Sequence, residues 1–168
     1  FPINLNKINK LQTIGLGGGC HWCTEAVFQQ LDGTSNVRQG YIKSTPPNDT
    51  WSEAILLDYD PESIDLLQFI DIHLQTHAST ADHKRRQEYR SAIYYFNEEQ
   101  KLALGTDLIS LSRKRSNFYI TQLLEFVEFK ESRESIRDYY RTRPDAPFCK
   151  RYIEPKLEIV KRMMKKEL

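Results

Sequence analysis

Residues 17–25 read Gly-Gly-Gly-Cys-His-Trp-Cys-Thr-Glu, and the rest of the chain can be interpreted outward from this stretch. The run before it, residues 11–16, is apolar and β-branched, which predicts a strand. In residues 24–31 the apolar side chains recur at helical spacing, which predicts a helix. The three glycines between them allow a tight turn and a close approach of the backbone to a ligand. The order is therefore strand, glycine turn, cysteine and helix.

Cys20 stands where the predicted helix begins. The unpaired N–H groups and the positive dipole end of a helix N-terminus favour an anion, and a thiolate is an anion. We therefore expect the pKa of Cys20 to lie below its ordinary value of about 8.5. This position makes Cys20 a candidate nucleophile.

The 168 residues are most simply one domain, long enough to bury about two-thirds of the surface that the unfolded chain exposes. There is no internal repeat, low-complexity tract or linker, and the patterns favour an α+β domain with helices packed on a mixed sheet. The expected strands are residues 11–16, 37–42, 51–59, 89–96 and 119–129, and the expected helices are residues 24–31, 64–75, 97–112, 132–140 and 155–166.

Asp60 and Asn97 are the capping residues expected for two of these helices, those of residues 64–75 and 97–112. Residues 1–10 are expected to be an N-terminal extension. Residues 143–168 are expected to be a mobile, proline-flanked C-terminal tail that carries Cys149 and a terminal helix.

The charge balance excludes several classes of partner. Charged residues make up 28% of the chain but the net charge is only +1, so we expect no nucleic-acid partner. The one local excess of positive charge, residues 83–86, is typical of a solvated face. No apolar run approaches the roughly 20 residues that a membrane helix needs, and the first residues lack the features of a secretory signal. We therefore expect a soluble protein without a membrane partner.

Three cysteines are an odd number and form no disulfide framework of the kind that small secreted domains use. Reduced, reactive thiols fit better, which predicts a cytoplasmic protein. The numbering begins at Phe1 rather than at a methionine, so an upstream targeting segment is left open.

Cys20 and Cys23 form a C-x-x-C pair, which is compatible with three kinds of site. A metal site would usually need a second short-spaced pair of ligands, and none is present. A thioredoxin-like dithiol fits a C-x-x-C at a helix start, but the preceding glycines and the absence of an opening βαβ unit disfavour it. In the third interpretation Cys20 alone attacks a substrate and another thiol resolves the adduct.

Residues 17–25 resemble the G-C-F-W-x-x-E signature of the A-type peptide methionine sulfoxide reductases. The similarity continues in matching order to about residue 157. It runs through Gly40-Tyr41, Ser52-Glu53-Ala54, Tyr59-Asp60-Pro61, Tyr89-Arg90-Ser91-Ala92-Ile93-Tyr94, Pro147-Phe148-Cys149 and Ile153-Glu154-Pro155-Lys156-Leu157. One short motif can arise by chance, whereas the ordered set is specific.

The resemblance implies a protein-repair enzyme of oxidative stress, which reduces the S epimer of methionine sulfoxide, free or in proteins, to methionine. It implies that Cys20 becomes a sulfenic acid, that Cys149 resolves it as a disulfide, and that a thioredoxin-like dithiol reduces the disulfide. No metal or organic cofactor is implied. The fold expected with it is a two-layer α/β sandwich of the ferredoxin-like type, and we expect a monomer.

Reduction of a sulfoxide by a thiol requires an acid beside the thiol. A sulfoxide oxygen is a poor leaving group, so reduction needs a soft nucleophile at sulfur and a proton donor at oxygen. Cys20 supplies the first and Glu53 the second. An apolar site walled by Trp22 would raise the pKa of Glu53 above about 4.3. Strand alternation places Glu53 on the same side as Ile55, Leu57 and Tyr59.

Two further roles are assigned by the resemblance, and one stays open. Trp22 would form part of the pocket for the substrate S-methyl group, and Tyr89 would bind the sulfoxide oxygen. Cys23 competes with Cys149 as the resolving thiol, because a C-x-x-C pair in a first helical turn can come within disulfide distance.

Three departures from the family pattern concern the substrate site. His21 stands where the family has Phe, which makes one wall of the methyl pocket titratable with an ordinary pKa of about 6.5. The loop of residues 42–52 lacks the family's N-P-T-Y segment, so Tyr41 is the candidate for the second oxygen-binding hydroxyl. Lys84 occupies a position at which the family has Asp.

Two rival functions remain from the sequence. A general disulfide oxidoreductase would use Cys20 and Cys23 and would depend little on Glu53. A redox-sensing or sulfoxide-binding module would bind sulfoxide or form an adduct on Cys20 without turnover.

Overall fold

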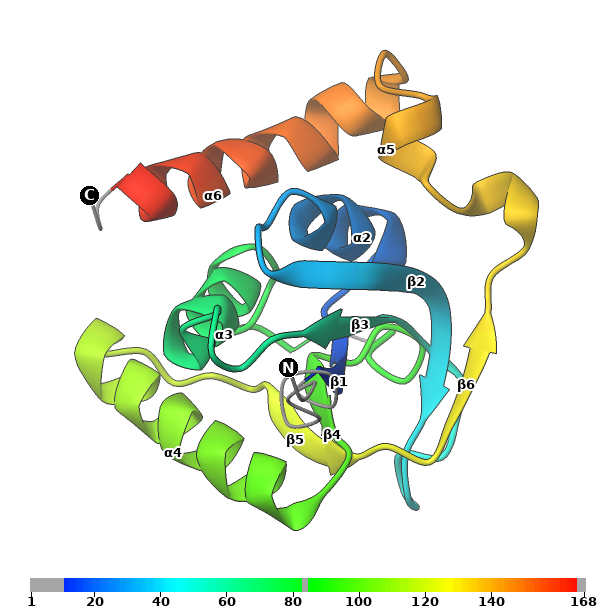
Figure 1. The fold of residues 1–168 in the computed structure, drawn as a ribbon. Coiled ribbons are helices and arrows are strands. Elements are labelled where there is room, and N and C mark those ends of the chain that lie inside the picture. The colour runs from blue at the N-terminus through cyan, green and yellow to red at the C-terminus, as the bar shows by residue number, and fades with distance from the viewer. Residues whose placement is uncertain (1–10, 83–84, 166–168) are drawn as a thin grey trace, which may run out of the picture.

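The computed structural model describes residues 11–82 and 85–165, so the expected extension of residues 1–10 and the departure at Lys84 lie outside the described residues. Figure 1 shows a curled sheet with helices packed against it. The strands are β1 (Gln12–Gly17), β2 (Thr34–Lys43), β3 (Ser52–Tyr59), β4 (Ala92–Tyr95), β5 (Gln122–Glu125) and β6 (Glu128–Glu131). The helices are α2 (His21–Gln29), α3 (Leu66–Gln75), α4 (Glu98–Arg115), α5 (Tyr139–Thr142) and α6 (Glu154–Lys165), with a 3₁₀ turn, η1 (Glu134–Ile136), and a π-helical turn, η2 (Cys149–Ile153).

The six strands form one mixed sheet in the order β5-β4-β1-β3-β2-β6. Only the β4–β5 pair is parallel, and the other neighbours are antiparallel. β1 and β3 lie at the centre, with Gly15 opposite Leu56. The predicted α+β class with a mixed sheet is confirmed.

Alternation along β3 divides the core between the two faces of the sheet. Ile55, Leu57 and Tyr59 belong to the main core, which the helices cover. Ala54 and Leu56 belong to a smaller core on the other face. Since side chains alternate along a strand, Glu53 lies on the side of the main core, as the sequence predicted.

Residues 119–129 were expected to be one strand and instead form β5 and β6, on opposite edges of the sheet. The connection crosses between the two edges. Phe126 N donates to Tyr95 O at 3.0 Å, and Val127 N donates to Lys43 O at 3.1 Å. The expected helix of residues 132–140 is likewise divided, into η1 and α5.

One of the two predicted helix caps is confirmed and the other is wrong. Asn97 accepts a hydrogen bond from Gln100 N at 2.8 Å and caps α4. Asp60 instead accepts from Glu62 N and Ser63 Oγ, which closes a turn. The cap of α3 is Asp65, which accepts from Leu67 N at 3.1 Å.

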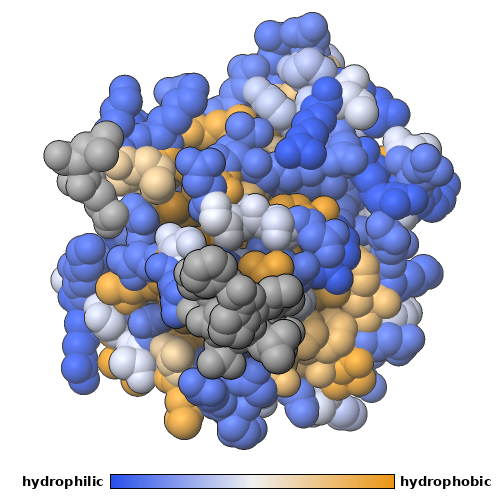
Figure 2. All heavy atoms as spheres, in the orientation of Figure 1, coloured by the Kyte–Doolittle hydropathy of each residue, from blue (hydrophilic) through white to orange (hydrophobic). Residues whose placement is uncertain are grey.

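The surface shown in Figure 2 is mostly polar, with apolar patches scattered between charged side chains. Within residues 11–82 and 85–165, no helix has the length and apolarity that crossing a membrane requires.

Candidate active site

Cys20 occupies the N-cap position of α2, with an extended backbone (φ −63°, ψ 126°). The turn before it depends on glycine at two positions. Gly19 has φ +111°, a conformation that residues with a Cβ rarely adopt. A Cβ on Gly18 would lie 2.5 Å from Cγ of His77. The predicted strand, glycine turn, cysteine and helix are therefore observed, with α2 beginning three residues earlier than expected.

The thiols of Cys20 and Cys23 are hydrogen-bonded to each other, and both are free. This bond, followed by burial, raises the pKa of Cys20. The same bond lowers the pKa of Cys23. The prediction of a lowered pKa at Cys20 itself is therefore wrong. The backbone N–H of Trp22 does favour the Cys20 thiolate, as expected for a helix start, but the neighbouring thiol outweighs it.

Glu53 lies directly beside the start of α2. Its Oε1 accepts a hydrogen bond from the backbone N–H of His21 at 3.1 Å. The same oxygen is 3.3 Å from Nε2 of His21. Nδ1 of His21 is 2.8 Å from the carbonyl oxygen of Gly40 on β2. The carboxyl group, the imidazole and the backbone next to Cys20 thus form one connected group.

The two candidate tyrosines lie next to this group. Tyr41 is opposite Glu53 in the β2–β3 register, and its ring meets the His21 imidazole edge-on at 5.3 Å between centroids. Tyr89 is hydrogen-bonded to Glu53, and burial followed by the Glu53 charge raises the pKa of the phenol. Glu53 N also donates to Glu88 O at 2.8 Å, which ties the segment before Tyr89 to β3.

Trp22 is part of an aromatic cluster that the sequence did not reveal. Its ring stacks on Tyr139, with centroids 4.0 Å apart and planes 2° apart, and meets Phe148 edge-on at 5.3 Å. Tyr139 is held in place by Glu25 on α2, whose carboxylate accepts hydrogen bonds from the backbone N–H groups of Asp138 and Tyr139. No local sequence signal links Trp22 with a tyrosine so far along the chain.

Cys149 is fully buried, in the π-helical turn that leads into α6. It packs with Cys23, Ala26 and Ile153, and this cluster also touches Cys20. Its thiol donates to Arg143 O at 3.1 Å, and burial raises its pKa. Cys149 is thus buried where the turn before α6 packs against α2, and α6 runs alongside α2 (Figure 1). The mobility expected for this tail stays a prediction.

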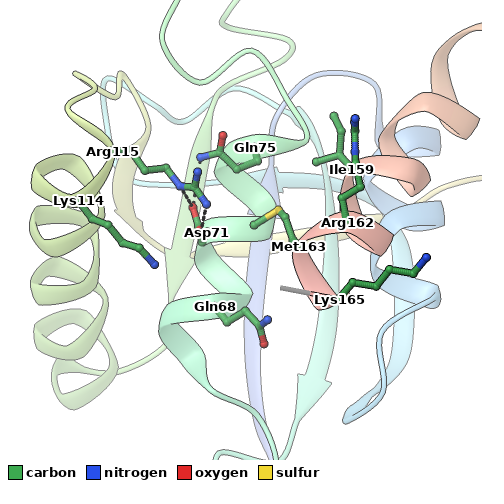
Figure 3. Close-up of a pocket in the computed structure, with 9 residues that line it drawn as sticks. All are labelled: Gln68, Asp71, Gln75, Lys114, Arg115, Ile159, Arg162, Met163 and Lys165. Atoms are coloured by element: carbon green, nitrogen blue, oxygen red, sulfur yellow. Dashed lines mark hydrogen bonds and ion pairs between the residues drawn. The ribbon is translucent and has the colours of Figure 1, made fainter. Parts of the chain in front are cut away.

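A separate hollow of about 650 Å³ lies between α3, α4 and α6. Figure 3 shows the guanidinium group of Arg115 turned toward Asp71, to which it donates two hydrogen bonds. The hollow is lined mostly by charged and polar side chains, and it includes none of the predicted site residues.

The described fold therefore brings every predicted site residue to one place, around the start of α2. A free thiol at a helix N-terminus, a second thiol in contact with it and a carboxyl group beside both are the parts of a thiol-dependent oxidoreductase site.

Comparison with known proteins identifies the class more narrowly. The family model described as peptide methionine sulfoxide reductase matches residues 12–168. A peptide methionine sulfoxide reductase MsrA of Sulfolobus acidocaldarius is 33% identical over 170 residues, covering 92% of this chain and 94% of the relative. An MsrA of Acinetobacter baumannii is 32% identical, covering 88% and 92%.

Solved structures agree in fold. Reduced Mxr1 from Saccharomyces cerevisiae has a TM-score of 0.71 at 21% identity, covering 82% of this chain and 88% of that one. Methionine sulfoxide reductase A of Corynebacterium diphtheriae has a TM-score of 0.66 at 20% identity, covering 82% and 77%. Mxr1 in complex with Trx2 has a TM-score of 0.61 at 20% identity, covering 77% and 85%.

The chain belongs to the peptide methionine sulfoxide reductase family. The family and the enzyme class predicted from the sequence are confirmed.

Proposed function

We propose that this methionine sulfoxide reductase acts on the S epimer, with Cys20 as nucleophile and Glu53 as proton donor. The observation that carries the proposal is the position of the Glu53 carboxyl group. Its Oε1 is hydrogen-bonded to the backbone N–H of His21, the residue that follows Cys20. A sulfoxide whose sulfur meets Cys20 would therefore have its oxygen within reach of an acid.

The thiol pair supplies the nucleophile. Because Cys20 donates a hydrogen bond to Cys23, which raises the pKa of Cys20 and lowers that of Cys23, loss of one proton from the pair leaves the charge on Cys23. We propose that Cys20 passes its proton to Cys23 as it reacts. The Cys20 sulfur attacks the sulfoxide sulfur, Glu53 gives its proton to the oxygen, and the S–O bond breaks as the S–S bond forms. The hydroxide released, or a water molecule in its place, then adds to the Cys20 sulfur and breaks the S–S bond. Methionine leaves, reduced by two electrons, and Cys20 becomes a sulfenic acid.

The aromatic cluster supports the proposed substrate pocket. Trp22, backed by Tyr139 and Phe148, offers an apolar surface next to Cys20 for the S-methyl group. The phenol of Tyr89 donates its O–H to Glu53 here and would turn this O–H to the sulfoxide oxygen once substrate is bound. Tyr41 is the proposed second hydroxyl.

For the resolving step we propose Cys23 as the first thiol to react and Cys149 as the next. Cys23 already contacts Cys20, whereas Cys149 packs behind Cys23. The thiol of Cys23 condenses with the Cys20 sulfenic acid to give a disulfide and one water molecule. We propose that a thioredoxin-like dithiol then reduces the disulfide, which the complex of Mxr1 with Trx2 supports.

We also propose that the central strands form a ferredoxin-like sandwich. The order β4-β1-β3-β2, all antiparallel, with α2 after β1 and α3 after β3, supports this topology. We further propose that the protein works in a reducing compartment such as the cytoplasm, which its three free cysteines support.

The test is turnover of a chiral aryl methyl sulfoxide, followed by chiral chromatography, with dithiothreitol as reductant. The wild-type protein should consume only the S epimer, so that half of a racemic mixture remains, and Cys20→Ser should be inactive. Normal turnover by Cys20→Ser would contradict the proposal.

Peptide mapping after one equivalent of sulfoxide tests the resolving step. We expect a disulfide between Cys20 and Cys23, and a link between Cys20 and Cys149 would reverse the proposed order. Because the contact between Cys20 and Cys23 also fits a general disulfide oxidoreductase, insulin reduction should be measured in parallel. Insulin reduction that survives Glu53→Gln, without sulfoxide turnover by the wild type, would favour that rival.

A further inference from the structure

His21 has a defined tautomer in this site. Its Nδ1 is 2.8 Å from the carbonyl oxygen of Gly40, and a carbonyl can only accept a hydrogen bond. Nδ1 therefore carries a proton. The other nitrogen, Nε2, faces Oε1 of Glu53 at 3.3 Å. In the neutral imidazole this nitrogen has a free lone pair, so it accepts the Glu53 proton when the carboxyl group is protonated.

We propose that His21 and Glu53 hold between them the single proton that goes to the sulfoxide oxygen. His21 thus serves as a positioning residue that keeps Glu53 supplied with it. This rests on the proposed role of Glu53 as proton donor. Phe, which the family carries at this position, has no nitrogen that could take part, so the arrangement is a property of this chain.

Burial supports a shared proton. The side chain of His21 is 4% exposed and that of Glu53 is 19% exposed, so the pair reaches solvent on the Glu53 side. Burial lowers the pKa of His21, which keeps the imidazole neutral and its lone pair available. The charge of an ionised Glu53 acts in the opposite direction and raises that pKa, so a proton that leaves either partner is favoured on the other.

The charged and titratable groups around the pair include a cation, Arg85, on which the charge of Glu53 acts. Those on the packed elements are Cys20 on the same helix start, Tyr41 on β2, Lys130 on β6, and Tyr89 and Arg85 in the segment before β4. Lys130 lies over the ring of Trp51, and Arg85 pairs with Glu88 and lies over Tyr89. Glu53 is thus the carboxylate in direct contact with the imidazole.

The proton balance of one turnover is simple. Before the reaction the pair holds one proton, between Oε1 and Nε2. During it the proton passes to the sulfoxide oxygen, and the resulting Glu53 carboxylate keeps the hydrogen bond from the backbone N–H of His21. The pair regains one proton from water before the next turnover.

The experiment is the pH dependence of kcat for wild type, His21→Phe and His21→Gln. In His21→Phe, Glu53 must hold the proton alone, so the pH at which activity declines should be lower than in wild type, and kcat relative to wild type should fall by about tenfold as pH rises. His21→Gln can still hydrogen-bond Glu53 but cannot carry a proton, so it should behave like the Phe variant. A wild-type pH profile of kcat in either variant would overturn the proposal. A wild-type profile in His21→Gln but not in His21→Phe would show that His21 acts only through its hydrogen bond to Glu53.

A second measurement avoids dependence on the folding of the variants. In ¹⁵N spectra of wild-type protein, we expect Nδ1 of His21 to be protonated and Nε2 to titrate, and Glu53→Gln to shift that titration to lower pH, because the charge of Glu53 raises the pKa of His21. An unprotonated Nδ1, or a titration that Glu53→Gln leaves unchanged, would contradict the proposal. If Cys20→Ser retained sulfoxide turnover, the proposed function would fail instead, so the two failures are distinguishable.

Discussion

Two regions of this molecule contain buried histidines, and the charged groups next to the histidines differ between the two. At the start of α2, His21 faces the Glu53 carboxyl group. At the end of α3, the tilted rings of His73 and His77 lie 4.3 Å apart between centroids, and the charges acting on them are the cationic Lys156 and, at His77, Arg86. Burial lowers the pKa of all three. The comparison teaches that burial is common to the three histidines, and that the carboxylate partner is what sets His21, the proposed proton carrier, apart from the other two.

The largest expected effect separates the two regions by activity. Glu53→Gln removes the proton donor, so kcat should fall by about 10²–10⁴-fold. The amide oxygen can still accept the hydrogen bond from His21 N, so the free energy of unfolding should change little. Steady-state kinetics and urea unfolding check the two parts. A variant that kept full turnover would remove the basis for treating the His21 region as catalytic.

His73 on α3 should control stability at acidic pH. The pKa of His73 falls to about 4 in the folded protein, chiefly through burial, so the unfolded chain takes up a proton first as pH decreases. Relative to an unfolded value of about 6.5, this difference corresponds to about 3 kcal/mol lost between pH 6.5 and pH 4. Urea unfolding across this range should show a steeper loss for wild type than for His73→Gln. An equal loss of unfolding free energy with pH in the two proteins would contradict the role assigned to His73.

Gly18→Ala tests how the two regions are connected. The added Cβ would meet the ring of His77, which is fixed by hydrogen bonds to His73 O and Ser91 Oγ. We expect a loss of about 1–3 kcal/mol in the free energy of unfolding. Activity should also decrease, since the turn precedes Cys20. Thermal unfolding measures the loss of stability, and turnover measures the loss of activity. If neither changed, the ring of His77 would have to move aside freely.

The smallest expected effect is confined to the α3 region. Ser91→Ala removes the hydroxyl that lies 2.7 Å from His77 Nε2 and 2.7 Å from Thr121 Oγ1. The expected cost is about 1 kcal/mol of stability, without any change in the pH profile of kcat. A shifted pH profile would show that the two histidine regions are coupled.

The sequence predicted those parts of the site that local patterns determine. The glycine turn, the helix start at Cys20 and the side of β3 that carries Glu53 all follow from spacing along one segment. Asn97 was recognisable as a cap for the same reason. The ordered similarity then assigned the family.

The remainder depends on contacts between distant segments. The stacking of Tyr139 on Trp22 and the burial of Cys149 result from α6 packing back on α2, which leaves no local pattern. The pKa of Cys20 was predicted in the wrong direction because helix position alone neglects the hydrogen bond with Cys23. Asp60 and Asp65 are both plausible caps, and only the turn closed by Asp60 decides between them.

The connection through residues 126 and 127, between the two edge strands of the sheet, has a consequence for solubility. By pairing β5 with β4 and β6 with β2, it covers the edge of the ten-residue β2 and leaves two outermost strands of four residues each. β6 also carries Glu128, Lys130 and Glu131. Short, charged outer strands offer a poor template for another chain, so this connection protects the sheet against edge-to-edge aggregation.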